Sequence, residues 1–451
     1  MHSAQMVKNM KIKELIEATG AKVLTEVDKD LDVKISTDTR TIQKGDFYLP
    51  LKGASFDGEK FINQALEKGA AGTFVTDNHL TLTLSVQRGN KNILQVKDTL
   101  TAYLQLANYR RKKLNFTVVA ITGSSGKTTT KELAASVLSE KFRTFKTPLN
   151  HNNEIGFCQT VFEAPDDTEI LVLEMGMRGL GEIELLSKYA EPDITIISNV
   201  GTAHIGRLGS RENIARAKCE IVKHQRGNIF IAHDDELIKK TVQFSGKKIF
   251  YSLKDVKLLE KDIHYSKFEY KDNVYELNAG GDYNIENALS AINAGLALGM
   301  KVNEIQSGLK KYSPIEKRWE AVNAGGFEII NDSYNANPES MRAFIDTIFE
   351  LYEKPVVILG DMGELGDDEI KYHSELGSYI NSHKNLKQDA EILSIGKLSK
   401  YITDEVKNCP AKHFETIEQA AAYLKNKDAS VQIFLKASRS MKFERIIEEL
   451  K

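Results

Sequence analysis

The chain has 451 residues, with 61 Lys and Arg against 63 Asp and Glu and a formal net charge of -2. Its 41% hydrophobic and 27% charged residues are ordinary for a soluble globular protein, which excludes a disordered chain. The balanced charge offers no basic field for nucleic acid or an anionic membrane. At about 150 residues per domain, the length predicts about three domains.

The cysteines and apolar runs predict a reducing compartment. Cys158, Cys219 and Cys409 are odd in number and far apart, and no Cys-x-x-Cys pair occurs. Neither a disulfide framework nor a cysteine zinc site is therefore expected. Residues 1–15 lack the apolar stretch of a signal peptide, and no apolar run is long enough to span a bilayer. We expect a cytoplasmic protein with reduced thiols.

The first stretch, up to about Lys113, alternates helical patterns with a strand. Helices are predicted at residues 11–20 and 61–70, and a strand at 71–77. A further helix, 99–113, ends in a basic run, which indicates either a domain edge or a solvated helix end.

Two series of short apolar runs follow, and each alternates with helical patterns. Such alternation is typical of βαβ units with a buried, mostly parallel sheet. The first series predicts strands at residues 117–122, 169–174, 193–199 and 228–232. The second, after Trp319, predicts a separate doubly wound unit with strands at residues 327–332, 355–361, 391–396 and 431–436. The segment 313–320 between the two series contains Pro314 and is a predicted hinge.

A glycine-rich loop joins the predicted strand 117–122 to a helical pattern. Glycines let consecutive backbone N–H groups point at phosphate oxygens, and the helix N-terminus adds partial positive charge. Lys127 would reach the β- and γ-phosphates, and the Thr128 hydroxyl would hold Mg²⁺. Ile121 stands where the strict P-loop has glycine, so this is a shorter form. A helix-capping turn without a ligand is the alternative, but the strand–loop–helix context favours ATP or GTP. The candidate nucleotide-binding residues are Gly123, Ser124, Ser125, Gly126, Lys127, Thr128 and Thr129.

Polar residues at the predicted strand ends supply further candidates, because ligands of open parallel sheets bind beyond the carboxyl ends of the strands. Glu174 follows such a strand and is the expected carboxylate anchor for Mg²⁺ beside the loop. Three other features are ambiguous alone. His204 could equally be a hydrogen-bonded loop histidine with no ligand, and the Asn-rich segment 150–156 could be only a turn. Lys218 could be only a solvated charge on a helix.

Taken together, the motifs resemble the Mur ligase family across essentially the whole chain. The family-wide marks lie at residues 121–130, 174–176, 197–210, 217–221 and 281–291. The strings that indicate its D-alanyl-D-alanine-adding branch lie at residues 36–53, 331–343, 359–366 and 436–446. Three positions differ from the family pattern, since Tyr283 replaces a His, Gly206 an acidic residue and Ala437 a Gly.

The resemblance implies an α/β fold of three domains. Residues 1–113 would form a small α/β domain that holds the UDP-sugar end of the substrate. Residues 114–318 would form the central P-loop parallel-sheet domain that binds ATP. Residues 319–451 would form a Rossmann-like doubly wound domain for the D-alanyl-D-alanine side and for closure over ATP.

The resemblance also implies ATP and two Mg²⁺ ions, with Lys127, Glu174, His204 and Lys218 as catalytic residues. Thr128 and Glu174 would hold the first ion. His204 and Lys218 would serve the second, with Lys218 as a carbamate formed with CO₂. Nucleotide contacts are implied for Asn284, Asn287, Arg318 and Asp332. Substrate contacts are implied for Ser36, Asp38, Thr39, Arg40, Asn152, Asn153, Asn335, Asn337, Ser438 and Arg439.

The implied reaction joins D-alanyl-D-alanine to UDP-N-acetylmuramoyl-tripeptide through an acyl phosphate, in peptidoglycan precursor synthesis. A monomer without nucleic-acid or membrane partners is expected. The alternatives are a MurE-type ligase, a folylpolyglutamate synthase-like ligase, or a nucleotide switch that ligates nothing. The Asn-Ala-Asn-Pro string at 335–338 argues against both ligases. The joint presence of Glu174, His204 and Lys218 argues against a switch.

Overall fold

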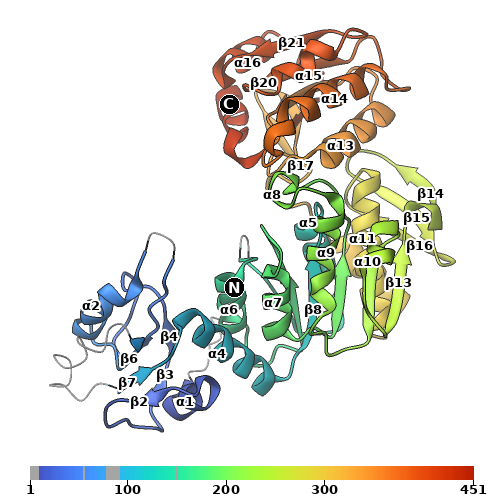
Figure 1. The fold of residues 1–451 in the computed structure, drawn as a ribbon. Coiled ribbons are helices and arrows are strands. Elements are labelled where there is room, and N and C mark those ends of the chain that lie inside the picture. Colours follow the sequence, from blue (N-terminus) through green and yellow to red (C-terminus); the bar gives the residue numbers. More distant parts are fainter. Residues whose placement is uncertain (1–9, 54–55, 78–91, 149–150) are drawn as a thin grey trace. The chain divides into compact units, whose positions relative to one another are not determined.

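The computed structural model describes residues 10–53, 56–77, 92–148 and 151–451. Residues 1–9, discussed above for a signal peptide, and Asn150 of the Asn-rich segment lie outside the described residues. The chain separates into two compact units, and Figure 1 colours it from the N-terminus in blue to the C-terminus in red. The first comprises residues 1–118, 143–173 and 188–191, and the second comprises residues 119–142, 174–187 and 192–451.

The first unit contains a five-stranded sheet in the order β2-β7-β6-β5-β4. Its strands are β2 (Lys22–Val23), β4 (Ile35–Ser36), β5 (Phe47–Tyr48), β6 (Gly72–Val75) and β7 (Asn92–Gln95). Only β6 was predicted. Strands β2, β4 and β5 have two residues each, too few to show an alternating pattern, and the four residues of β7 do not alternate either. The predicted helices are confirmed as α1 (Ile12–Thr19), α2 (Ile62–Glu67) and α4 (Thr99–Leu114). Strand β1 (Met10–Lys11), which directly precedes α1, pairs with β3 (Asp32–Val33) in an antiparallel two-stranded ribbon.

A six-stranded sheet in the order β13-β12-β11-β8-β10-β9 forms the centre of the chain. The four predicted strands are confirmed as β8 (Thr117–Thr122), β10 (Ile170–Glu174), β11 (Ile194–Ile197) and β12 (Ile229–His233). Prediction missed the two edge strands, β9 (Thr144–Lys146) and β13 (Lys247–Tyr251). Both edges are partly exposed and lack the continuous apolar run of a buried parallel strand.

Helices that follow the central strands carry several candidate residues. They are α5 (Lys127–Leu138), α6 (Glu154–Glu163), α7 (Glu182–Ala190), α8 (Ile205–Leu208), α9 (Arg211–Cys219) and α10 (Glu236–Thr241). Next come three antiparallel strands that the sequence did not predict, β14 (Val256–Lys261), β15 (Ser266–Tyr270) and β16 (Asn273–Leu277). Helices α11 (Asp282–Ala297) and α12 (Val302–Lys311) then pack against α5.

The C-terminal region, orange to red in Figure 1, is a second six-stranded sheet in the order β17-β18-β22-β19-β20-β21. The predicted strands are confirmed as β18 (Phe327–Asn331), β19 (Val356–Gly360), β20 (Glu391–Ile395) and β22 (Ile433–Lys436). Two edge strands were not predicted, β17 (Glu320–Ala324), which is antiparallel, and β21 (Ala411–Phe414). One face packs on α13 (Pro338–Leu351), α14 (Glu369–Asn381) and α15 (Lys400–Glu405), and the other on α16 (Ile417–Leu424) and α17 (Glu444–Leu450).

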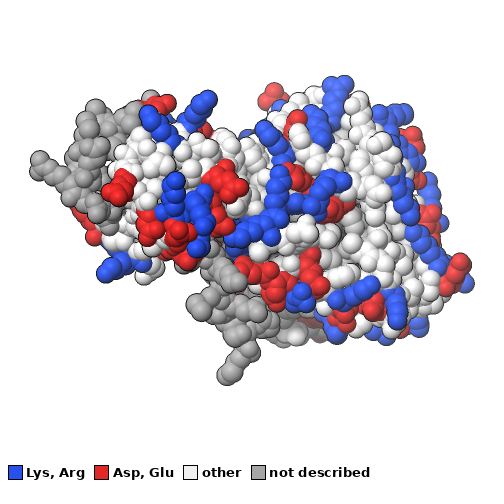
Figure 2. Space-filling view, turned by 90° about the horizontal axis from the view of Figure 1, so that it is seen from below, with Lys and Arg blue, Asp and Glu red and all other residues white. Residues whose placement is uncertain are grey.

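The surface agrees with the balanced composition. Figure 2 shows Lys and Arg side chains interspersed with Asp and Glu on the face drawn. Within the described ranges, no helix combines the length and apolar character needed to cross a membrane.

Candidate active site at the phosphate loop

The glycine-rich loop leaves β8 at the point where the strand order of the central sheet reverses, between β8 and β11. Gly126 has a φ of 76°, and a Cβ there would lie 2.3 Å from Oδ1 of Asn287. At Gly123, a Cβ would lie 1.8 Å from Oγ of Ser198. The Lys127 ammonium folds back over the loop, where Nζ donates to the Gly123 carbonyl at 2.9 Å. The loop therefore has the tight, glycine-dependent turn that phosphate binding requires.

The residues after β11 hold this loop in shape. The Ser125 amide donates to Oδ1 of Asn199 at 3.0 Å, and Nδ2 of Asn199 donates back to the Ser125 carbonyl at 3.1 Å. The Gly201 amide donates to Oγ of Ser124 at 2.9 Å. Asn199 is the last residue of the strand predicted at 193–199, and nothing in the sequence indicates its contact with the loop. Its reciprocal bonds brace the loop without a ligand, so little reorganisation is needed when phosphate binds.

We expect Gly126→Ala to weaken nucleotide binding by at least about tenfold, because the new Cβ forces the loop away from Asn287. Gly209→Ala is the matched control, since Gly209 has the same φ of 76° and open space around it. Both variants carry the backbone strain of a left-handed alanine, about 1–2 kcal/mol. Titration calorimetry with ADP checks the difference, and equal affinities in the two variants would show that the overlap is harmless.

The carboxylate expected beside the loop is in place, and it has a partner that the sequence did not predict. Glu174 is the last residue of β10 and is 8% exposed. The ammonium of Lys131, 1% exposed on α5, lies 3.7 Å from Oε2 of Glu174 and 3.2 Å from Oε1 of Glu132. Lys131 lies one helical turn after Lys127, and this spacing is the signal by which the sequence could have identified it.

The two candidate lysines share one electrostatic environment. Burial lowers the pKa of Lys127, while the Glu174 charge raises it and the Arg318 charge lowers it. Burial lowers the pKa of Lys218 well below its ordinary value, and the Lys127 charge lowers it further. Lys218 is only 1% exposed on α9, so the alternative interpretation of Lys218 as a solvated charge on a helix is wrong. A neutral Lys218 amine is a nucleophile, which is the form that CO₂ requires.

His204 lies in the loop after β11 with a φ of 66°, and its Nδ1 is 2.5 Å from Oε2 of Glu364. The imidazole of His204 at this distance lowers the pKa of Glu364. The Gly206 amide donates to the Glu364 carbonyl at 3.3 Å, and a Cβ at Gly206 would lie 2.5 Å from the Gly366 nitrogen. The close approach leaves no room for a side chain at position 206.

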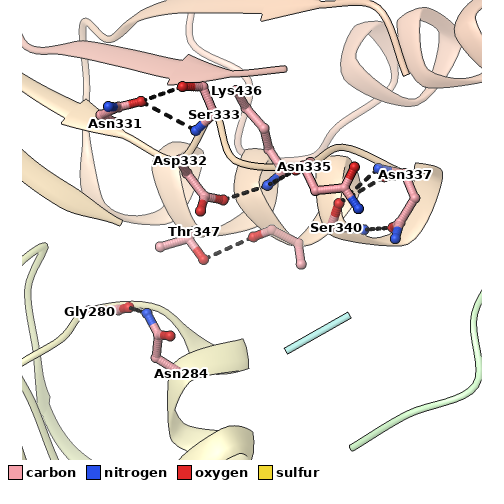
Figure 3. A network of polar contacts seen from close by, with 11 residues as sticks. Gly280, Asn284, Asn331, Asp332, Ser333, Asn335, Asn337, Ser340, Thr347 and Lys436 are labelled. Carbon is pink, nitrogen blue, oxygen red and sulfur yellow. Dashed lines mark hydrogen bonds and ion pairs between the residues drawn. The ribbon is translucent and has the colours of Figure 1, made fainter. Parts of the chain in front are cut away.

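The expected nucleotide residues of α11 are both buried, and one of them reaches the phosphate loop. Oδ1 of Asn287 accepts from the Thr130 hydroxyl at 3.1 Å. Nδ2 of Asn284 donates instead to the Gly280 carbonyl at 2.7 Å, as Figure 3 shows. Nearby, Tyr283 packs edge-on against Trp319 with ring centroids 5.6 Å apart.

Arg318 is presented by an unusual stretch of backbone. Its neighbours Lys317 and Trp319 have φ values of 60° and 59°, and the Trp319 indole is anchored by donating to the Ile263 carbonyl at 2.7 Å. The Arg318 guanidinium lies 3.9 Å from the ring centroid of Tyr334. Left-handed residues on both sides of one side chain are costly and persist where tertiary contacts impose them.

The remaining C-terminal candidates follow β18 and β22 in the sequence, and Figure 3 shows Asn335 and Asn337, which follow β18. The Asn337 side chain caps α13, accepting from the Ser340 amide at 2.9 Å. The Ser438 and Ser440 hydroxyl oxygens lie 3.1 Å apart, and Arg439 pairs with Glu444 at 2.6 Å. The Asn337 amide group therefore has a structural role in this structure.

The candidates for the UDP-sugar end all belong to the first unit. Asp38 pairs with Arg40 at 2.7 Å, which lowers the pKa of its carboxyl to about 2. The Thr39 hydroxyl donates to Gln64 at 3.0 Å, and the Ser36 hydroxyl donates to the Asp38 carbonyl at 3.3 Å. Of the asparagine pair, Asn153 caps α6 by accepting from the Gly156 amide at 2.9 Å, and Asn152 directly precedes it.

A strand–loop–helix phosphate site at the switch point of a parallel sheet, with a carboxylate at the neighbouring strand end, defines a P-loop nucleotide-binding α/β protein. Comparison with known proteins is more specific. Residues 121–295 match the Mur ligase middle domain, and residues 317–439 match the Mur ligase, glutamate ligase domain. Residues 34–111 match the catalytic domain of the Mur ligase family.

Full-length relatives agree. A Bacillus subtilis UDP-N-acetylmuramoyl-tripeptide–D-alanyl-D-alanine ligase is 36% identical and covers 98% of both chains. The Haemophilus influenzae ligase of the same name is 30% identical over 97% of each chain. A crystal structure of MurF from Acinetobacter baumannii superposes with a TM-score of 0.85 at 28% identity, covering 98% of both chains. A Thermotoga maritima MurF ligase in complex with ADP gives 0.81 at 28% identity, covering 94% of this chain and 98% of that one. The chain belongs to the Mur ligase family.

Proposed function

We propose that the chain is a MurF ligase, which adds D-alanyl-D-alanine to UDP-N-acetylmuramoyl-tripeptide at the expense of ATP in peptidoglycan precursor synthesis. The observation that carries the proposal is the likeness over 98% of both chains to a ligase of that name. Three domains, at residues 1–113, 114–318 and 319–451, divide the work into UDP-sugar capture, ATP activation and dipeptide delivery. The reaction belongs in the cytoplasm, where ATP is available.

The chemistry follows from the poor reactivity of a carboxylate toward an amine. The peptide carboxylate attacks the γ-phosphorus of ATP, and the bond to the β-phosphate oxygen breaks to release ADP. The acyl phosphate so formed is attacked by the dipeptide amine. The tetrahedral intermediate then expels inorganic phosphate and loses a proton, leaving the amide. In-line positioning and charge neutralisation supply most of the catalysis.

The residues of the phosphate loop have the first role in this scheme. The loop amides and Lys127 bind the β- and γ-phosphates and neutralise the charge that gathers as the two anions meet. Asn287, which packs against Gly126, keeps the loop closed around the phosphates. Arg318 and Asp332 serve the nucleotide from the C-terminal side. The dipeptide side falls to Asn335, Asn337, Ser438 and Arg439.

The donor set fits Mg²⁺, because the Thr128 hydroxyl and the Glu174 carboxylate are hard oxygen donors beside the phosphate loop. His204 and a carbamate on Lys218 would serve a second ion. When bound, the ions supply charge neutralisation at the phosphates. The carbamate forms when the neutral Lys218 amine attacks CO₂ and loses a proton. It replaces an ammonium, which would repel Mg²⁺, with an anionic oxygen ligand.

The alternative ligases share the fold. A structure of UDP-N-acetylmuramoyl-L-alanyl-D-glutamate–2,6-diaminopimelate ligase superposes with a TM-score of 0.54 at 15% identity. A Thermotoga maritima folylpolyglutamate synthase gives 0.54 at 16% identity. Identities this low speak only for the fold. The Asn-Ala-Asn-Pro string at 335–338 and the nearly full-length relatives favour the dipeptide-adding activity.

Phosphate release by the purified protein tests the proposal. With ATP, Mg²⁺ and UDP-N-acetylmuramoyl-tripeptide, we expect release that depends on D-alanyl-D-alanine. Single amino acids, diaminopimelate and glutamate serve as competing acceptors. Each rival is tested with its own acyl substrate: release with diaminopimelate on UDP-N-acetylmuramoyl-L-alanyl-D-glutamate would indicate the first rival, and release with glutamate on a folate would indicate the second. No release with any acceptor, in protein that binds ATP, would indicate a nucleotide switch.

A further inference from the structure

A buried lysine at the end of β22 connects two groups that the proposed ligase uses for different substrates. Lys436 is the last residue of β22 and is 3% exposed. Its Nζ donates to Oδ2 of Asp332 at 2.5 Å and to the Asn335 carbonyl at 3.4 Å. Figure 3 shows the lysine reaching between the Asp332 carboxylate and the loop that carries Asn335.

The sheet fixes this arrangement. Strand β22 lies between β18 and β19, and Asp332 is the residue that follows β18. The Asp332 amide donates to the Leu435 carbonyl at 2.8 Å, so both charges sit on neighbouring strand ends. The ammonium also lies 5.4 Å from the centroid of the Phe344 ring, on α13. Carboxylate, carbonyl and ring together surround the ammonium.

Stability alone does not account for a lysine at this position. Removing an ammonium and a carboxylate from water costs several kcal/mol, and apolar side chains of similar volume are often as stabilising as a buried ion pair. Phe434, two residues earlier on the same face of β22, packs in the apolar layer with Phe344. What an apolar residue at 436 cannot provide is a directed hydrogen bond to each of two groups.

We propose that Lys436 is a positioning residue for both ATP and the dipeptide. It holds the Asp332 carboxylate on the nucleotide side and the Asn335 backbone on the dipeptide side, so that one ammonium sets the spacing between the two substrates. Lys436 contacts neither substrate and acts through these two groups. The inference rests on the ligase function proposed above.

Lys436→Met tests it by steady-state kinetics. We expect the KM for ATP and the KM for D-alanyl-D-alanine each to rise by about tenfold or more, because small displacements of binding groups have large effects. In the double variant with Asp332→Asn, the KM for ATP should equal that of Asp332→Asn alone, since the lysine acts on ATP through Asp332. The KM for the dipeptide should stay raised in the double variant.

The matched control is Lys427→Met. Lys427 pairs with Glu391, the first residue of β20, so this pair lies at the amino ends of the parallel strands, whereas Lys436 lies at their carboxyl ends. The side chains of this pair are 25% and 10% exposed. We expect this variant to have a lowered Tm and unchanged KM values. If Lys436 had only a structural role, Lys436→Met would likewise lower the Tm and leave both KM values unchanged.

A second variant, Lys436→Gln, keeps a hydrogen-bond donor and covers the case in which Lys436→Met does not fold. Wild-type KM values in folded Lys436→Met would overturn the inference, and so would wild-type KM values in Lys436→Gln, whose donor stands on a side chain one bond shorter and cannot reach both Asp332 and Asn335. Failure of the wild-type protein to release phosphate with both substrates would refute the proposed function instead, so the two failures are distinguishable.

Discussion

Lys127→Ala is expected to form no measurable ADP in the complete ligase assay, a loss of at least about 10³-fold. Cations that stabilise the charge of a transferring phosphoryl group contribute effects of this size. The ammonium already lies against the loop, 2.9 Å from the Gly123 carbonyl, so it is placed to move onto bound phosphates. The measurement is coupled ADP release at saturating ATP, with Tm recorded alongside.

The control for this loss is Lys141→Ala, which removes an exposed lysine just beyond the far end of α5. Lys141 donates only to the Gly299 carbonyl at 2.8 Å among the bonds described, so its removal should leave ADP release unchanged. Substantial turnover by a folded Lys127→Ala variant would contradict the assignment of the phosphate loop. A large fall in its Tm would assign the loss to folding instead.

Lys218→Ala is expected to lose ligase activity by about two orders of magnitude or more and to recover part of it when short-chain carboxylic acids are added. Such acids place a carboxylate where the carbamate would stand. The expectation rests on the burial of Lys218, 1% exposed, and on the lowering of its pKa well below the ordinary value. Acid should oppose carbamate formation, because protonation removes the lone pair that attacks CO₂.

Two comparisons make this prediction specific. Ethylamine in place of the acids restores an ammonium, so rescue by ethylamine alone would contradict the carbamate and favour a cationic role. Lys223→Ala, a neighbouring lysine whose side chain is 50% exposed and pairs with Glu184, should behave as wild type. Wild-type activity in Lys218→Ala itself would remove the carbamate from the mechanism.

The order of secondary structure in the two large sheets was predictable from the sequence, whereas their edges were not. Buried parallel strands such as β8 and β19 are continuous apolar runs, and that pattern survives without any tertiary information. Edge strands such as β13, which begins with two exposed lysines, lack it. The antiparallel strands β14 to β16 also lack a continuous apolar run, since β14 has no buried residue and β15 and β16 alternate buried with partly exposed residues over only five positions each.

In the candidate site, too, the sequence predicted some of the residues and not others. Glycine spacing revealed the phosphate loop, because a turn with left-handed φ at Gly126 needs that residue type locally. The partners of Asn199, Lys131 and Lys436 could not be predicted. Each is an ordinary polar residue with a partner far away in the chain: Lys131 lies 43 positions from Glu174, Asn199 lies 74 from Ser125, and Lys436 lies 104 from Asp332.

The sequence by itself determined the family, the phosphate loop and the candidate residues at the strand ends. These features depend on the residue types of turns and on the spacing of apolar residues, which can be recognised within short segments of the chain. Only the tertiary structure decided which ionisable groups share one environment. It buried Lys218 near the Lys127 charge, put Lys131 against Glu174, and set Lys436 between Asp332 and Asn335. Burial and charge proximity depend on strands that become neighbours only when the sheet forms, and they control the protonation and placement that catalysis requires.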